Sequence, residues 1–284
     1  MSLHAMAANV LGGLTVAGIP AEGGGEGETF QAPGTEVFYW PVIAGQDSSW
    51  AITRPAVVLL ISVGLIGWFF IRMSGRRLAV VPSKGQFVGE IAYDFVRNTI
   101  AKDIIGGKDF IRFVPLLMTL FTVILVNNVF GIVPFVQYPT MSRIGFPIVL
   151  TLIVYLTYHA VGIKTKHGIG TYLAGLIPPG LPGWLKPIMF VLEFLTYFVI
   201  RPLTLALRLF GNMLAGHLML LVFIVGGEYL LLHGDNIGLK GAGVLSFAFS
   251  IVMTFFELLV EFLQAFIFTL LSALYLSDAV SEHH

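Results

Sequence analysis

The stretch from Arg201 to His217, RPLTLALRLFGNMLAGH, decides the fold because it places charged groups in the middle of a long apolar region. That region runs from Pro187 to Gly226, and Arg208 near its centre has no neighbouring carboxylate in the sequence. Arginine stays protonated at cellular pH, and placing it at a bilayer centre costs from about 2.5 to more than 10 kcal/mol. A chain tolerates this cost where the arginine faces a partner or a water-filled cavity. Arg208 is therefore the first candidate functional residue.

The composition around this stretch is that of a polytopic membrane protein. The 284 residues are 56% hydrophobic and only 11% charged, with a mean hydropathy of +0.87, whereas a soluble domain carries about 25% charged residues. The formal net charge is zero, which gives no reason to expect a nucleic-acid partner. The chain has no cysteine, so disulfides, iron–sulfur clusters and Cys-based zinc sites are excluded. No metal or cofactor is expected.

Two parts of the chain are predicted, a polar N-terminal arm over residues 1–54 and a single membrane domain over residues 55–284. The start lacks the cationic segment and cleavage pattern of a signal peptide, and a Gly/Glu run within the arm indicates a flexible segment. The domain is predicted to be all-α, with five transmembrane helices at about 55–71, 110–133, 146–163, 187–226 and 244–276. The first has about 17 residues, near the lower limit for crossing a bilayer, and Pro134 stops the second.

Residues 83–112 alternate apolar and charged positions at helical spacing. Phe87 and Ile91, for example, recur against Glu90 and Asp94. This pattern predicts an amphipathic interfacial helix over about 83–105, ended by the two glycines that follow.

The last two apolar regions are too long for ordinary spans. Forty and 33 residues correspond to about 60 and 50 Å of helix, against a hydrocarbon thickness of about 30 Å. Pro202 is the only proline inside the fourth region, and no strong turn signal divides either. We therefore expect two long, strongly tilted helices, joined by a short loop within the polar segment 227–241.

The basic residues predict the topology. With the N-terminus outside, the outer segments hold three, Arg54, Arg143 and Lys240, and two of the 16 lie inside the membrane. The inner loops hold eleven, namely Arg72, Arg76, Arg77, Lys84, Arg97, Lys102, Lys108, Arg112, Lys164, Lys166 and Lys186. This excess places the N-terminus outside and the C-terminus in the cytoplasm.

Several polar or small residues in the spans have two interpretations. Asn127 and Asn128, near the far end of the second span, either line a polar path or hold helices together; their spacing favours packing. Gly211, Ala215 and Gly216 beside the central arginine fit close packing within this chain and an external partner equally well.

Six ionisable residues lie in the last two helices and are joined by one glutamine: Glu193, Arg201, Arg208, His217, Glu257, Glu261 and Gln264. The last three of these are spaced i, i+4 and i+7, so they share one helix face. On the fourth span, Thr204, Arg208 and Asn212 are spaced i, i+4 and i+8 and form a second stripe. A lone Glu or His at such a position is often structural, but six ionisable groups on two adjacent helices favour a functional site.

The depths of these groups follow from the antiparallel arrangement of the two helices. If Gln264 lies opposite Arg208, His217 lies about 13 Å and Glu257 about 10 Å outward of that level, close enough in depth to share a proton. Glu193 lies about 22 Å toward the cytoplasm. Carboxylates and an imidazole at membrane depth are the groups that a proton relay needs, because they titrate and water can bridge them.

At these residues the sequence resembles the a subunit of the F-type ATP synthase membrane sector. The resemblance is strongest over Arg201 to His217, with its core Leu207-Arg-Leu-Phe-Gly-Asn212-Met-Leu-Ala-Gly216, and over Gln264-Ala-Phe-Ile-Phe-Thr-Leu-Leu271 with Tyr275-Leu276. Asn128 to Pro134 and Leu192-Glu193 match more loosely. The five-span plan extends the match from residue 55 to the end, and the N-terminal arm is not covered.

The resemblance implies a proton-conducting stator subunit without bond-making chemistry of its own, in the plasma membrane of a bacterium. In that family the single arginine, here Arg208, faces the carboxylates of a rotating ring of c subunits and separates two aqueous half-channels. His217 and Glu257 then belong to the outer half-channel and Glu193 to the inner one. Asn212, Glu261 and Gln264 join the proton pathway, with Arg201 and Thr204 in support. The implied partners are the c-ring, b-type peripheral stalk subunits, the rest of the synthase and membrane lipid.

Two departures from the family pattern stand out. Some bacterial members carry a carboxylate at position 217 and a histidine at position 257, and here the two are exchanged. Either order leaves one acid and one imidazole. Some relatives also carry an acidic residue in the loop 135–146, where this chain has Arg143.

Two other classes of protein compete with this interpretation. A self-contained proton-coupled secondary transporter is the alternative, although such transporters often show internal repeats and broken helices and this chain shows no repeat. An intramembrane hydrolase is disfavoured, because the spans contain neither a His-Glu-x-x-His metal motif nor a Gly-x-Ser-x-Gly elbow.

Overall fold

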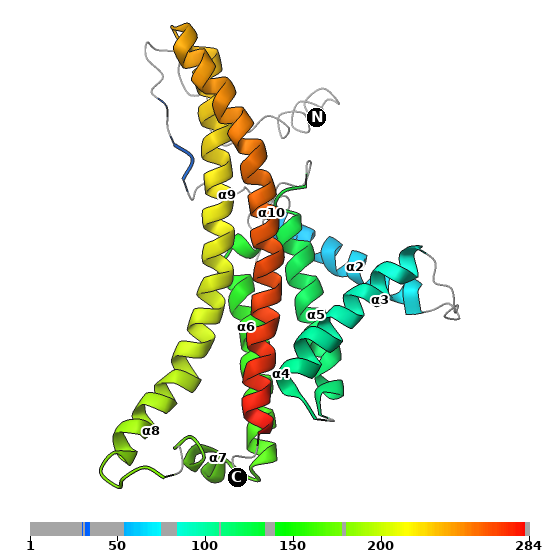
Figure 1. Ribbon diagram of the computed structural model, residues 1–284, viewed down its shortest axis with the longest axis vertical. Helices are drawn as coiled ribbons and strands as arrows, with labels where there is room; N and C mark the ends of the chain where they lie inside the picture. The colour runs from blue at the N-terminus through cyan, green and yellow to red at the C-terminus, as the bar shows by residue number, and fades with distance from the viewer. Residues whose placement is uncertain are drawn as a thin grey trace, which may run out of the picture.

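A computed structural model describes residues 30, 32–34, 54–74, 84–107, 109–133, 140–177 and 180–281. Over these ranges the chain is helical and contains no strand (Figure 1). Five helices are long and apolar enough to cross a membrane, which confirms the all-α fold with five spans. The basic cluster at Arg76 and Arg77 and nearly all of the N-terminal arm lie outside the described residues.

The first three spans are α2 (Arg54–Ser74), α5 (Phe110–Val129) and α6 (Gly145–Thr165). Two of them match the predicted ranges, and α5 ends four residues before the predicted end at residue 133. Beyond this end the chain continues in turns, in which the amides of Gly131 and Ile132 donate to the carbonyl oxygens of Asn128 and Val129 at 2.8 and 3.0 Å. A short helical turn (Thr140–Ser142) precedes α6, and α7 (Ile169–Ala174) follows it.

The predicted interfacial helix is present as α3 (Lys84–Asp94), a π-helical segment (Phe95–Lys102) and α4 (Asp103–Ile105). Its two halves differ. Phe87 and Ile91 in α3 are exposed, whereas Val96 and Ile100 in the π-helical segment are fully buried. The second half is therefore part of the bundle core, packed against α5 and α10, and does not lie wholly on a surface.

The fourth span is one bent helix, formed by α8 (Lys186–Leu195), a π-helical segment (Thr196–Ile200) and α9 (Arg201–His233). Pro202 has no N–H to donate within the helix, and its ring displaces the preceding turn, which is the usual cause of such a bend. Because of this bend α8 diverges from α10 at the lower end of Figure 1.

The two long helices are longer than predicted. The α8–α9 helix has 48 residues and α10 (Ile237–Val280) has 44, so the connection expected over 227–241 contains only residues 234–236. Gly227, which was predicted to lie in the polar connecting segment, instead belongs to α9 and contacts Gly243 of α10. A Cβ atom on Gly227 would lie 3.2 Å from the carbonyl oxygen of Gly243, and one on Gly243 would lie 3.0 Å from that of Gly227. Glycine here lets two backbones approach closely.

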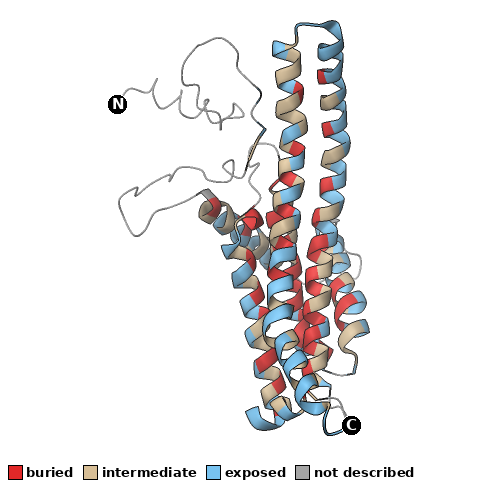
Figure 2. Cartoon of the chain, turned by 90° about the vertical axis from the view of Figure 1, so that its left-hand side faces the viewer, coloured by how far each residue is buried: buried red, intermediate tan, exposed pale blue. Residues whose placement is uncertain are grey.

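The core lies in the half of the bundle opposite the α9–α10 turn, and the outer part of that hairpin extends beyond it (Figure 2). Core side chains include Leu117 and Ile124 of α5, Tyr158 of α6 and Phe268 of α10. The helix ends α4, α7 and α8 and the C-terminus gather at the end away from the hairpin turn (Figure 1). Several of the basic residues predicted to share one side lie in these segments or next to them in the chain, namely Lys102 before α4, Lys164 and Lys166 at the end of α6, and Lys186 at the start of α8.

The two asparagines of α5 hold helices together. Asn127 is fully buried and exchanges hydrogen bonds with Ser62 of α2, its Nδ2 lying 2.9 Å from Ser62 Oγ. Asn128 is also fully buried, and its Nδ2 lies 3.5 Å from the backbone carbonyl oxygen of Glu261 in α10. The packing interpretation therefore accounts for both side chains.

Candidate functional site

Thr204, Arg208 and Asn212 form an exposed stripe on α9, as their spacing predicts. The Thr204 hydroxyl donates a hydrogen bond to the carbonyl oxygen of Ile200 at 2.7 Å, so its hydrogen-bond partner lies within the same helix. Among the described residues, no carboxylate lies within ion-pair distance of the Arg208 guanidinium. An arginine in a membrane-spanning helix with no acidic partner among the described residues needs a charge-compensating group from another segment or another chain.

On the side of Arg208 nearer the α9–α10 turn, these two helices bring His217 and Glu257 together. His217 Nδ1 lies 3.9 Å from Glu257 Oε1, and both side chains are buried. The two side chains therefore lie at similar levels along α9 and α10. The distance is long for a direct hydrogen bond but is one that a single water molecule can bridge. Gly216 lies against this pair, since a Cβ atom there would be in ordinary contact with Glu257 Oε1 at 3.6 Å.

Gln264 lies opposite Asn212 and not opposite Arg208 as assumed. Asn212 Nδ2 donates to Gln264 Oε1 at 2.7 Å. The two helices are therefore offset by about one turn from the assumed register. The sequence did not predict this offset, because it does not specify how two helices align. The residue that lies nearest in register to Arg208 is then the buried Phe268.

A cavity of about 300 Å³ lies beside these groups. Its polar lining consists of Asn212, Glu257, Glu261 and Gln264. The Glu261 side chain is 1% exposed, and neither of its carboxylate oxygens has a hydrogen-bond partner in the described part of the chain. Buried polar groups are normally paired, so a buried acid lining a cavity is suited to holding a proton or to binding water.

A second cavity, of about 190 Å³, lies toward the opposite end of α9. Glu193 of α8 lines it together with Asp278 of α10 and Lys166 at the end of α6. Tyrosines from several helices complete the polar wall: Tyr158, Tyr172, Tyr197 and Tyr275. Along α9, Arg208 therefore lies between this cavity and the one that Asn212 lines.

Arg201, unlike Arg208, has an acidic partner in this chain. Its Nη2 lies 2.9 Å from Asp278 Oδ2, and its guanidinium lies over the rings of Tyr197 and Tyr275, 3.7 and 4.8 Å from their centroids. The sequence analysis missed Asp278, because the fifth span was predicted to end at residue 276. If the span had been predicted to continue for one more turn, Asp278 would have been recognised as an acid that needs a cationic partner.

His159 of α6 is another buried group that the sequence analysis missed. It lies among aromatic rings, and its Nδ1 is 2.9 Å from the hydroxyl oxygen of Tyr172 in α7. Burial raises the pKa of the Tyr172 hydroxyl to about 12, so this hydroxyl keeps its proton over the physiological range. No feature of local spacing pairs these two residues, which are brought together by the fold of α6 on α7.

The fold and the site define a class of protein. The chain is a multi-pass membrane protein with an exposed intramembrane arginine between two cavities that contain carboxylates. Within the described residues, no three His, Cys, Asp or Glu side chains are grouped as a metal site requires. Ionisable residues in membrane-spanning helices are rare and often mark the path of an ion or proton.

Comparison with known proteins identifies the family. The profile described as "ATP synthase A chain" matches residues 56–277. The ATP synthase subunit a of Pseudarthrobacter chlorophenolicus is 44% identical over 262 residues, covering 92% of this chain and 96% of the relative. That of a Nocardioides species is 41% identical over 269 residues, covering 91% and 96%, and that of Streptomyces lividans is 36% identical over 261 residues, covering 91% of each. The chain belongs to the ATP synthase subunit a family, which is part of the proton-translocating Fo sector.

Proposed function

We propose that this protein is the stator subunit that conducts protons to and from the c-ring through two offset half-channels, which Arg208 separates. The observation that carries the proposal is the position of Arg208. It is exposed on α9, has no carboxylate beside it in the described part of the chain, and lies between two cavities that contain acids. A carboxylate on a ring of partner subunits supplies the missing countercharge.

On the outer side, the proposed pathway uses the cavity beside Asn212. His217 and Glu257 pass protons between them through water, since 3.9 Å separates their nearest atoms. Glu261 lies one helical turn further along the same cavity wall and receives the proton next. The Asn212–Gln264 hydrogen bond fixes the helix spacing at the level where the proton reaches the ring.

On the inner side, the proton leaves the ring toward Glu193. Arg208 attracts the ring carboxylate in its ionised form and so favours release of its proton on the inner side. Because the guanidinium is a permanent cation, it also repels a proton that would otherwise cross directly between the cavities. Proton flow is thereby coupled to ring rotation and to ATP synthesis.

We further propose the orientation and the assembly that the sequence predicts. The membrane domain covers residues 55–284 in the plasma membrane of a bacterium, with the arm over 1–54 outside and the C-terminus in the cytoplasm. The gathering of basic helix ends and the C-terminus at one end of the bundle supports this orientation. With 48 and 44 residues, the last two helices span a bilayer of about 30 Å only if they are strongly tilted or extend beyond it. The partners are the c-ring, b-type peripheral stalk subunits and surrounding lipid.

The replacement of Arg208 by alanine tests the proposal. We expect ATP-driven proton pumping by inverted vesicles to be lost while the complex still assembles, because an exposed side chain does not hold the fold together. Arg112→Ala is the matched control, since Arg112 is an exposed arginine whose weak ion pair with Asp109 spans 3.7 Å. Normal pumping by Arg208→Ala would overturn the proposal and favour a self-contained transporter, in which no ring is needed.

A further inference from the structure

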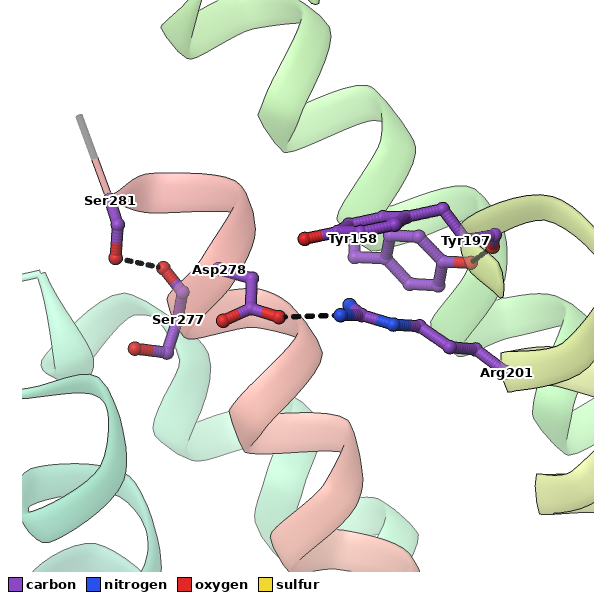
Figure 3. A network of polar contacts seen from close by, with 6 residues as sticks. All are labelled: Tyr158, Tyr197, Arg201, Ser277, Asp278 and Ser281. Atoms are coloured by element: carbon purple, nitrogen blue, oxygen red, sulfur yellow. Dashed lines mark hydrogen bonds and ion pairs between the residues drawn. The ribbon is translucent and has the colours of Figure 1, made fainter. Parts of the chain in front are cut away.

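Arg201 is held by side chains of α10 and of the π-helical segment that precedes α9. It lies at the start of α9, two turns before Arg208, and its guanidinium is 2.9 Å from Asp278 in the last turn of α10. Figure 3 shows the guanidinium directed at this carboxylate, with the Tyr158 and Tyr197 rings beside it. The side chains of Arg201 and Asp278 are 17% and 33% exposed, so the pair is largely shielded from solvent.

Two aromatic rings complete the contacts of the guanidinium. Tyr197 belongs to the π-helical segment before α9, and Tyr275 belongs to α10. The guanidinium carbon lies 3.7 and 4.8 Å from the two ring centroids, within the range of a cation–π interaction. From the third helix, α6, the hydroxyl of Tyr158 donates to the backbone carbonyl oxygen of Tyr197 at 2.7 Å.

These contacts lie where the bent helix leaves the bundle. Pro202 and the π-helical segment bend the chain here, and α8 then diverges from α10 (Figure 1). Asp278, Tyr197 and Tyr275 also line the cavity that contains Glu193. The ion pair therefore joins the two walls of this cavity at the level where they begin to separate.

We propose that Arg201, Asp278, Tyr197 and Tyr275 form a clamp that sets the width of the Glu193 cavity and fixes the height of Arg208. Arg201 is then a positioning residue and exchanges no proton itself. The assignment of the Glu193 cavity to the inner half-channel rests on the proposed function. The clamp itself concerns the separation of the helices and can be measured without transport. Arginine suits the position because its planar guanidinium stacks on rings and bonds a carboxylate at the same time, which the compact ammonium of lysine does less well.

The clamp is tested by the chemical accessibility of the cavity wall. The chain has no cysteine, so a single Ala279→Cys substitution gives one reactive thiol. Ala279 is 5% exposed and lines the cavity beside Asp278. The rate of labelling by a small water-soluble methanethiosulfonate is measured on the purified whole complex in lipid nanodiscs, where the reagent reaches both faces. The variants are R201Q, D278N, the double variant and R201K, and R112Q is the control.

We expect R201Q and D278N each to be labelled about tenfold faster than the parent, because removing one partner of this partly buried pair leaves the other charge uncompensated. The double variant is labelled about as fast as either single variant, since groups that act as a unit are not additive. R201K keeps the charge and falls between the parent and R201Q, and R112Q matches the parent.

Three outcomes would overturn the clamp: unchanged labelling in R201Q and D278N, a double variant whose acceleration equals the product of the single effects, or R201K labelled as fast as R201Q. Arg208→Ala in the same Ala279→Cys background separates this proposal from the function. If the clamp and the function both hold, this variant loses pumping and keeps parental labelling. If only the function fails, pumping persists while the clamp variants are still labelled faster.

Discussion

The His217–Glu257 pair gives the sharpest test of the outer pathway. The perturbation is His217→Gln, Glu257→Gln and the double variant, each of which removes a titratable group and leaves a polar side chain of similar size. At 3.9 Å, an imidazolium and a carboxylate attract each other by about 4 kcal/mol at an effective dielectric constant of about 20. Desolvation offsets part of this attraction, and we expect a coupling of about 1–2 kcal/mol to remain.

That coupling predicts a characteristic pattern of rates. Each single variant should slow proton pumping by about ten- to thirtyfold, which corresponds to about 1.4–2 kcal/mol. The double variant should be little slower than either single variant, because a relay that has lost one group gains little from the other. Independent groups would instead give the product of the two effects, a slowing of about a hundredfold or more.

The assay is ATP-driven proton pumping by inverted vesicles that contain the complete complex, normalised to the amount of assembled complex. Glu228→Gln and His233→Gln are the matched controls, because both residues lie in α9 and are exposed. The exchange of His217→Glu with Glu257→His adds a second test, since it keeps one acid and one imidazole at the same depth and should recover more activity than either exchange alone. A double glutamine variant with multiplicative slowing would refute the shared relay and leave Glu261 as the better candidate for the group outward of Arg208.

Three further outcomes are expected. Gly243→Ala should lower the stability of the complex by about 1–3 kcal/mol, because the added Cβ atom would lie 2.8 Å from Leu231 Cγ and 3.0 Å from the Gly227 carbonyl oxygen. Gly211→Ala is the control, since a Cβ atom there meets no atom within 4 Å. A melting curve of Gly243→Ala that matches the parent would contradict the glycine contact. Asn127→Leu should destabilise assembly by about 1–3 kcal/mol, because it leaves the buried Ser62 hydroxyl without this partner, and loss of pumping at full assembly would speak instead for a polar path. A reporter at the C-terminus should be cytoplasmic and a tag within 21–50 accessible from outside, and the reverse labelling would exchange the inner and outer sides of every group named above.

Local pattern and composition were sufficient to predict the fold class. The low charge content and five long apolar regions predict a five-span helical membrane protein, and helical spacing predicts the exposed stripe through Arg208. The similar level of His217 and Glu257 was predicted from the constant rise of two antiparallel helices, but it needed an assumed register that the Asn212–Gln264 contact shifts by about one turn. The spans and the stripe depend on distances along the chain, which the sequence contains in full.

The features that only the tertiary structure decided depend on contacts between distant residues. The sequence of the Gly-rich segment around Gly227 is compatible with a loop, and it is the opposing Gly243 that makes it a helix crossing. Nothing near Arg201 reveals Asp278, which lies 77 positions later and becomes its neighbour only through the full length of α10. The roles of the two arginines are likewise divided by packing. The sequence singles out Arg208 and gives Arg201 only a supporting place, but it does not show that Arg201 pairs with Asp278 while the Arg208 side chain is exposed.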